Sequence, residues 1–152
     1  MIRYTDSLDG IGPDMLEGFF VGWRTPRTPT EHLTILRDSG RFLLAIDDRA
    51  GRVVGFVTVL TDGLQAAFIP LLEVLPDMQG QGIGSELMRR IIQSLNDVAC
   101  VDLTCDAEVQ PFYERLGMQR SVGMVLRRDR LERETNPSEA KGGGHSDETR
   151  RL

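Results

Sequence analysis

The sequence has 152 residues, a length typical of one domain with a single buried core. Hydrophobic residues make up 40% of the chain and charged residues 27%, as in ordinary soluble globular proteins. The formal net charge of -5 and the pI near 5.0 argue against a general nucleic-acid-binding protein, because such proteins usually carry a basic face.

The first forty residues are predicted to form one strand and two helices. Ile2–Thr5 is predicted to be a strand, and Gly12–Phe20 predicts a short helix with a proline near its first turn. Two prolines indicate a loop over Val21–Thr30. In the following "TEHLTILRDSG" we expect Thr30 to cap a second helix and Gly40 to end it.

The middle of the chain predicts a β-hairpin and a further strand. "RFLLAID" (Arg41–Asp47) and "RVVGFVTVLTD" (Arg52–Asp62) are separated by the turn-forming "DRAG". The next strand is predicted over "QAAFIPLLEVLP" (Gln65–Pro76), where Pro70 lacks an N–H and should disturb the local ladder. The amphipathic segment "GSELMRRIIQSL" then predicts a helix.

The last third predicts a strand in "ACVDLTC", a short helix in "AEVQPFYERLG" and a final strand in "MQRSVGMVLRRD". One strand-helix-strand crossover should make Ala66–Leu75 parallel to Ala99–Cys105. We therefore expect an α/β (α+β) domain over residues 1–130, with a mixed, mostly antiparallel sheet and a central parallel pair flanked by helices. The polar, glycine-rich residues 131–152 predict a disordered tail.

Targeting and membrane segments are not indicated. No apolar run approaches the roughly 20 residues that a membrane-spanning helix needs. The start, "MIRYTDSLDG", has no basic segment followed by an apolar one, so it does not resemble a signal peptide. We expect a cytoplasmic protein without a membrane or nucleic-acid partner.

The cysteines and histidines exclude several chemistries. Cys100 and Cys105 lie in one predicted strand, so we expect two small buried side chains and neither a disulfide nor a metal site. The histidines are His32 and His145, the second in the predicted tail. Because a G-x-S-x-G motif is absent, a serine hydrolase is not supported, and His32 is expected to be solvated and without a role.

Three alternating glycines, Gly80, Gly82 and Gly84, precede the amphipathic helix. Glycines here can be turn residues only, but they also let an anion approach backbone N–H groups at the positive end of a helix. The ATP-type loop fails because no lysine follows Gly84, and the G-x-G-x-x-G fingerprint fails because Ser85 occupies the third glycine position.

The pattern that fits is Q-x-x-G-x-G after an apolar strand, here "LLEVLPDMQGQGIG". It resembles the GNAT superfamily of acetyl-CoA-dependent N-acetyltransferases. The resemblance implies that residues 79–85 bind the diphosphate of coenzyme A and that the strand end binds its pantetheine arm. It predicts the following cofactor-binding residues: Leu72, Val74, Leu75, Gln79, Gly80, Gln81, Gly82, Ile83, Gly84, Ser85, Asp106 and Phe112.

A second match lies downstream, where "DAEVQPFYERLGM" resembles the family pattern N-x-x-A-x-x-x-Y-E-K-x-G-F. Tyr113, Glu114 and Gly117 align with it. Asp106 replaces the usual asparagine, whose amide often contacts the cofactor arm, and that contact is therefore carried over only weakly. Substitutions also occur at Val109, Arg115 and Met118.

Acyl transfer to an amine needs a polarised carbonyl, a deprotonated amine and a protonated leaving thiolate. A backbone amide near Val74 suits the first task. Tyr113 has a reference pKa of about 10 and can protonate a thiolate whose conjugate acid has a pKa of about 8.5. The family uses a tyrosine here as general acid; the alternative is an aromatic side chain packed on the sheet.

Glu73 is the candidate general base. Strand alternation places it opposite Leu72 and Val74, and apolar surroundings would raise its pKa toward neutrality. Two alternatives remain open: the carboxylate binds the substrate ammonium, or it is solvated.

The acceptor is undefined by sequence. The resemblance places the loop with Phe20 and Trp23 over the acceptor site, while a packed connector is the alternative, and Arg24 and Arg27 are expected to face solvent. We expect acetyl transfer to a primary amine of a small molecule or peptide. The alternatives are a non-catalytic acyl-CoA-binding module and a protein acetyltransferase. A homodimer formed through the last strand is a further expectation.

Overall fold

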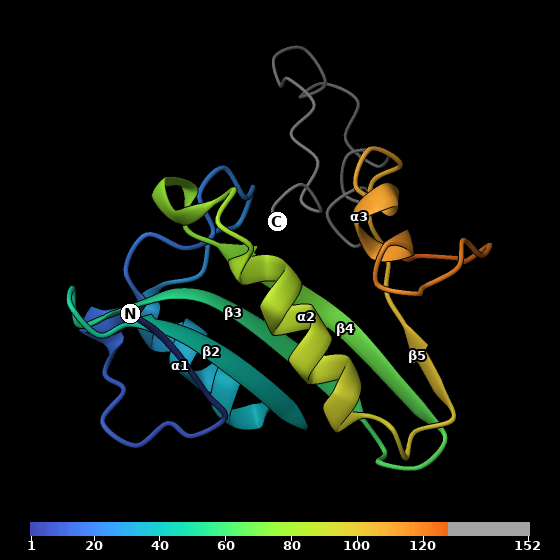
Figure 1. Cartoon of the computed structure of the whole chain (residues 1–152), viewed down its shortest axis with the longest axis horizontal. Helices are drawn as coiled ribbons and strands as arrows, with labels where there is room; N and C mark the ends of the chain where they lie inside the picture. Colours follow the sequence, from blue (N-terminus) through green and yellow to red (C-terminus); the bar gives the residue numbers. More distant parts are fainter. Residues whose placement is uncertain (128–152) are drawn as a thin grey trace.

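One sheet organises the molecule. In the computed structural model, which describes residues 1–127, five strands lie in the order β1-β2-β3-β4-β5 (Figure 1). All neighbouring strands are antiparallel except β4 and β5, which are parallel. The predicted mixed sheet with one parallel pair is confirmed, but within the described residues this pair lies at an edge. The strands are β1 (Ile2–Thr5), β2 (Arg41–Asp47), β3 (Arg52–Thr61), β4 (Ala66–Val74) and β5 (Cys100–Asp102).

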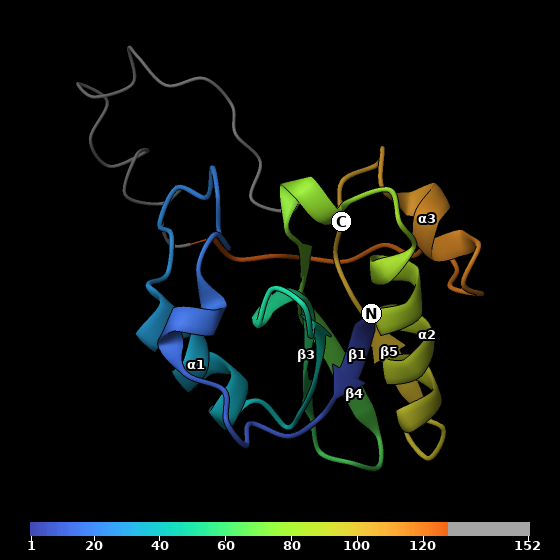
Figure 2. The ribbon, with the colours of Figure 1, turned by 60° about the vertical axis from the view of Figure 1, so that its left-hand side comes forward.

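Helical segments cover the two faces of the sheet. Figure 2 shows the sheet between α1 on one side and α2 on the other. We call these the α1 face and the α2 face. The segments are the 3-10 turn η1 (Pro13–Leu16), α1 (Pro29–Asp38), the 3-10 turn η2 (Pro76–Met78), α2 (Ile83–Ser94) and α3 (Gln110–Glu114).

The hairpin of β2 and β3 is confirmed, and β4 carries an irregularity. Thr58 pairs with Leu71 whereas Leu60 pairs with Phe68, so two residues of β4, Ile69 and Pro70, oppose one residue of β3. This β-bulge accommodates the missing N–H of the proline, as a strand proline usually requires.

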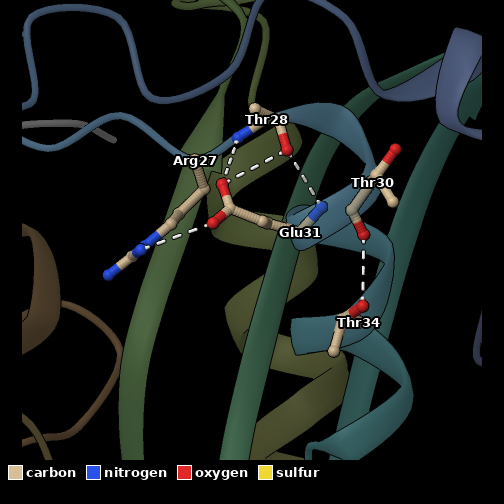
Figure 3. Close-up of polar contacts among 5 residues, drawn as sticks. All are labelled: Arg27, Thr28, Thr30, Glu31 and Thr34. Carbon is tan, nitrogen blue, oxygen red and sulfur yellow. Dashed lines mark hydrogen bonds and ion pairs between the residues drawn. The ribbon is translucent and has the colours of Figure 1, made fainter.

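The start of α1 differs from the prediction. Thr28, and not Thr30, is the N-cap: its hydroxyl accepts the N–H of Glu31 at 3.2 Å (Figure 3). The Glu31 carboxylate in turn accepts the N–H of Thr28 at 2.8 Å, which completes a capping box. The threonine three residues before a glutamate therefore caps the helix, because only that spacing lets both bonds form.

The predicted first helix is shorter than expected. Within Gly12–Phe20 only Pro13–Leu16 forms a 3-10 turn. Gly18 and Phe20 have φ values of 86° and 59°, which are left-handed conformations that an α-helix cannot contain. These residues turn the chain sharply and place the Phe20 side chain in the core.

The prediction of a final strand over Met118–Asp129 is also wrong for residues 118–127. Residues 118–127 form no strand, and 128–129 lie outside the described residues, as does the predicted tail 131–152. Alternating side chains do not suffice for a strand, because a strand also needs a neighbouring edge with which to pair. Self-association through this segment stays a prediction.

Different side chains fill the core on the two faces. On the α2 face, Gly55 lets α2 approach β3: a Cβ there would lie 3.1 Å from Leu87 Cδ1 and 3.2 Å from Ile83 Cγ2. On the α1 face, the rings of Phe19 and Phe56 lie 5.1 Å apart.

His32 belongs to this aromatic cluster on the α1 face and is fully buried, so the expectation of a solvated histidine is wrong. Its ring centroid lies 4.2 Å from that of Phe56. Burial lowers the pKa of His32 from 6.5 to about 4, which keeps the imidazole neutral at physiological pH.

Neither cysteine is fully buried, contrary to expectation: Cys100 is exposed and Cys105 half-buried, and both thiols are free. Cys100 lies at the sheet edge, where its side chain points outward beside the Asp102 carboxylate. Within residues 1–127, no helix is long and apolar enough to cross a membrane. The same residues contain no cluster of three metal-ligating side chains.

Candidate active site

The glycine turn leads directly into α2. Gly80 and Gly82 have φ values of 75° and 82°, and Gly82 is the N-cap of the helix. No side chain caps this end, and the first helical bond runs from Glu86 N–H to Gly82 C=O at 3.0 Å. The N–H groups of residues 83–85 consequently have no intrahelical acceptor. They form a cluster of donors at the positive end of the helix.

Ion pairs between neighbouring side chains reduce the negative charge next to this turn. Glu86, in the first turn of α2, would repel an anion if its carboxylate stood alone. Arg89 and Arg90 contact that carboxylate at 2.7 Å and 2.6 Å. These ion pairs lower the pKa of Glu86 to about 2 and offset its negative charge.

The turn is tied to the end of β4. The Gln79 side-chain amide donates to the Val74 carbonyl at 3.0 Å. Leu75 is paired on both sides, since its N–H donates to Val54 C=O at 2.9 Å and its carbonyl accepts Met78 N–H at 2.8 Å. Of the backbone groups of Val74 and Leu75, this leaves the N–H of Val74.

The direction of that N–H follows from strand alternation. Because Leu75 N–H points toward β3, the Val74 N–H points to the opposite edge of β4, toward β5. The β4–β5 ladder ends at Phe68 and Asp102, however, while β4 continues to Val74. The two strands meet at one end and diverge along β4 (Figure 1). The Val74 N–H therefore has no partner strand among the described residues.

The downstream motif packs against the same turn. An ideal Cβ on Gly84 would lie 3.6 Å from Val74 Cγ2 and 4.0 Å from Phe112 Cζ. Residues from β4, the start of α2 and α3 thus meet at one glycine. Asp106, half-buried, precedes α3 and its carbonyl accepts the N–H of Val109.

Tyr113 follows Phe112 on α3, and the two rings lie 5.0 Å apart in an edge-on arrangement. The side chain is 9% exposed and lines a cavity of about 880 Å³ between β5, α3 and residues 116–125. Burial raises the pKa of the Tyr113 phenol above its ordinary value, with a smaller contribution from Cys105. At neutral pH the phenol is protonated and can donate a proton.

Glu73 lies on the α1 face. It pairs with Phe56 across the β3–β4 ladder, and paired residues share a face, so the predicted alternation with Leu72 and Val74 is confirmed. The side chain is 3% exposed, which rules out a solvated carboxylate. Its two oxygens accept the N–H of Phe20 at 2.9 Å and 3.2 Å. In the described residues, Phe20 is the one non-glycine residue with positive φ, so Glu73 binds a backbone position that few non-glycine residues adopt. We call residues 20–28 the acceptor loop, after the position that the family resemblance predicts for them.

In the loop after Phe20, the Trp23 side chain packs against a neighbouring ring and also lines a cavity. The Trp23 ring lies 5.4 Å from that of Phe20, and both side chains line a cavity of about 620 Å³ on the α1 face. Trp23 thus packs on Phe20 and also lines the cavity, while its role in an acceptor pocket stays a prediction. Arg24 and Arg27 are exposed, as expected, and Arg27 lies 3.6 Å from Glu31.

This geometry can be compared with known proteins. A family model described as the acetyltransferase (GNAT) family matches residues 9–118. The chain belongs to the GNAT family.

Two solved structures are similar to it over most of its length. A Deinococcus radiodurans R1 protein, whose crystal structure is described as an acetyltransferase, is 49% identical, with a TM-score of 0.80 and coverage of 84% of this chain and 88% of that one. A GNAT family acetyltransferase from Streptococcus pneumoniae TIGR4 is 28% identical, with a TM-score of 0.65 and coverage of 84% and 99%.

A curated relative matches over part of its length. The uncharacterized N-acetyltransferase ycf52 of Gracilaria tenuistipitata var. liui is 31% identical over 102 residues, which are 64% of this chain and 55% of that protein. The chain thus spans about half the length of this relative.

The predicted site residues of this GNAT protein separate into two groups. Val74, Gln79, Gly84 and Phe112 come together at the start of α2. Glu73, Phe20 and Trp23 come together on the α1 face.

Sequence reasoning missed Thr58, which lines the α1-face cavity and is fully buried. The available signal was a single hydroxyl within the apolar run "VVGFVTVL".

Proposed function

We propose that this GNAT protein is an N-acetyltransferase, which moves the acetyl group of acetyl-CoA to a primary amine of a small molecule or peptide. The observation that carries the proposal is the Val74 N–H, directed to the side of β4 from which β5 diverges. It lies at the strand end that Gln79 ties to the amide cluster of residues 83–85. Amides so placed suit a thioester carbonyl and a diphosphate.

The residues present fit coenzyme A at the glycine turn. Donors at a helix N-terminus favour an anion, and the glycines leave the backbone accessible, since a Cβ on Gly80 or Gly82 would meet no atom within 4 Å. Residues 79–85 would hold the diphosphate, and Leu72 and Val74 would border the pantetheine arm. Bound acetyl-CoA supplies an acyl group activated as a thioester. Asp106, in place of the usual asparagine, offers acceptor oxygens and no amide donor there.

Tyr113 and Glu73 would manage the protons. Tyr113, whose phenol carries its proton at neutral pH, is placed on α3 next to Phe112 and would donate this proton to the departing thiolate. Glu73 would accept the proton of the attacking amine on the α1 face, directly or through water. Its two hydrogen bonds from Phe20 N–H fix the carboxylate in one orientation, as a general base requires.

Acetyl-CoA binding and thiol release across a panel of amines test the proposal. Binding is measured by calorimetry, and the acetylated product is identified by mass. A reaction without amine provides the blank for the two free thiols of the protein, Cys100 and Cys105. Binding without thiol release for any amine would favour the non-catalytic acyl-CoA-binding module, and absence of binding at millimolar acetyl-CoA would refute the cofactor site.

Two matched glycine variants locate the site. Gly82→Ala should weaken coenzyme A binding about tenfold or more, because a strained left-handed alanine turns the amides away and costs at least one charge-assisted hydrogen bond. Gly63→Ala is the control, since Gly63 has a φ of 80° and, like Gly82, open space around its Cβ position. Equal binding by both variants would show that the turn does not hold the cofactor.

A further inference from the structure

The cavity of about 620 Å³ on the α1 face has the size of a small-molecule site. It is bounded by the acceptor loop, the end of α1, strands β3 and β4, and residues 126–127. One of its lining residues, Phe20, donates its N–H to the Glu73 carboxylate, so the proposed base contacts the wall of the cavity. Its walls are largely apolar: Phe20, Trp23, Ile35, Leu60, Pro70 and Leu71.

Two buried polar groups belong to residues that line this cavity. Trp23 Nε1 and Thr58 Oγ1 are both shielded from solvent, and neither has a hydrogen-bond partner in residues 1–127. A buried polar atom without a partner costs about 1–3 kcal/mol, and folded proteins contain few of them. A ligand that pairs with both groups would recover part of this free energy.

The two groups differ in what they accept. The indole N–H of Trp23 can only donate, whereas the Thr58 hydroxyl can donate or accept. A carbonyl oxygen has two lone pairs and can pair with both. A protonated polyamine offers donors and methylene groups alone, so it would leave the indole N–H unpaired.

The charged residues around the cavity do not impose a strong preference. Arg27 is paired with Glu31 (Figure 3), and Asp38 at the end of α1 carries the opposite charge. Both side chains are exposed, so each contributes little to binding in water. Arg127 also lines the cavity and is half-buried, but its charge acts alike on amines of equal charge. Selection between ligands of similar size and equal charge therefore depends on the buried groups.

On the basis of the proposed acetyl transfer, we propose that this cavity binds the acceptor and selects an amine whose apolar body carries a carbonyl oxygen. An amino-acid amide and the first residue of a peptide both meet this description; a polyamine does not. The apolar walls take the side chain, Trp23 and Thr58 pair with the carbonyl oxygen, and the amine lies toward Glu73. Because neither polar atom is exposed, binding shifts the Trp23 loop slightly.

Trp23 itself provides the measurement, because it is the single tryptophan of the chain. L-Leucinamide and 3-methylbutylamine have the same apolar body and differ in the carboxamide. Titrating each against tryptophan fluorescence at about pH 6.5, where both amines are protonated, compares ligands of equal charge with and without the carbonyl. We expect leucinamide to bind about tenfold more tightly, the value of one to two neutral hydrogen bonds. Spermidine should leave the fluorescence unchanged.

Two variants assign the effect to the buried groups. Thr58→Val keeps the shape of the side chain and removes the hydroxyl, so it should weaken leucinamide binding about fivefold and leave 3-methylbutylamine binding unchanged. Trp23→Phe should do the same, measured by calorimetry because the fluorophore is lost. A purely structural Thr58 would change the unfolding midpoint without changing the ratio between the two amines.

Three outcomes would overturn the inference: equal affinity for leucinamide and 3-methylbutylamine, tighter binding of spermidine, or wild-type selectivity in both variants. These outcomes leave acetyl transfer intact if thiol is still released with any amine. Conversely, a selective fluorescence response without thiol release would support the cavity and refute the proposed enzyme activity. The two failures are therefore distinguishable.

Discussion

The two faces of the sheet contribute to the candidate site in different ways. On the α2 face, the proposed cofactor site consists mainly of backbone groups: the amides of residues 83–85 and the N–H of Val74. On the α1 face, the proposed acceptor site consists of side chains from the loop, α1, β3 and β4. A site built from backbone groups requires glycines at fixed positions, so its motif can be recognised in the sequence. A site built from side chains has no such motif, because many combinations of residues can line a cavity.

The largest expected effect concerns the chemistry on the cofactor side. Tyr113→Phe should lower kcat about 100-fold or more while leaving the KM values nearly unchanged, because a general acid acts in the transition state. Tyr4→Phe, on β1, is the control with the same atomic change, and it keeps the ring that lies 4.7 Å from the Arg90 guanidinium. Steady-state kinetics of both variants provide the check; wild-type turnover in Tyr113→Phe would reassign the tyrosine to packing.

The second-largest effect concerns the contribution of neutral His32, on the α1 face, to the stability of the fold. His32 has a pKa of about 4 in the folded protein and 6.5 as the ordinary value, so protonation favours the unfolded chain. Its contribution is present above pH 6.5 and is lost as the pH falls toward 4, at a cost of up to about 3 kcal/mol.

His32→Leu should remove this part of the acid sensitivity. Urea unfolding of wild type and variant at pH 7.5 and pH 4.5 measures it, since the carboxylates contribute equally to both proteins. An unchanged difference between the two pH values would mean that His32 does not remain neutral in the folded state.

A smaller effect distinguishes two roles of Glu73. Glu73→Gln retains an oxygen that can accept the Phe20 N–H but loses the base, so kcat should fall about tenfold or more. Glu73→Ala loses both and should also raise the KM for the amine and change the Trp23 fluorescence. If Glu73→Gln turned over at the wild-type rate, the carboxylate would be an anchor for the loop and not a base.

The smallest effect concerns the helix that supports the acceptor loop. Thr28→Ala removes the N-cap of α1 and should lower the free energy of unfolding by about 1 kcal/mol. Thr30→Ala is the matched control, because the Thr30 hydroxyl takes no part in the capping box. Thermal unfolding of the two variants distinguishes the caps, and equal midpoints would contradict the assignment of Thr28.

The features that the sequence predicted correctly are those that depend on interactions between residues close together in the chain. The hairpin of β2 and β3 was predictable because alternation and the "DRAG" turn are contained within it. The glycine turn was predictable because its conformation restricts the residue type. His32 was not, because the aromatic side chains that bury it come from the segment after η1 and from β3. The same holds for Glu73, whose partner Phe20 is 53 residues away.

The β-bulge at Ile69 and Pro70 determines which face of the sheet carries the Glu73 side chain. Successive side chains of a strand point to opposite faces of the sheet. The bulge therefore determines the face to which each following side chain points, up to Val74. If the ladder continued from the Leu60–Phe68 pair without the bulge, Glu73 would pair with Gly55 on the α2 face and Leu72 with Phe56 on the α1 face. The bulge therefore keeps the Glu73 carboxylate on the α1 face, beneath the loop that begins at Phe20.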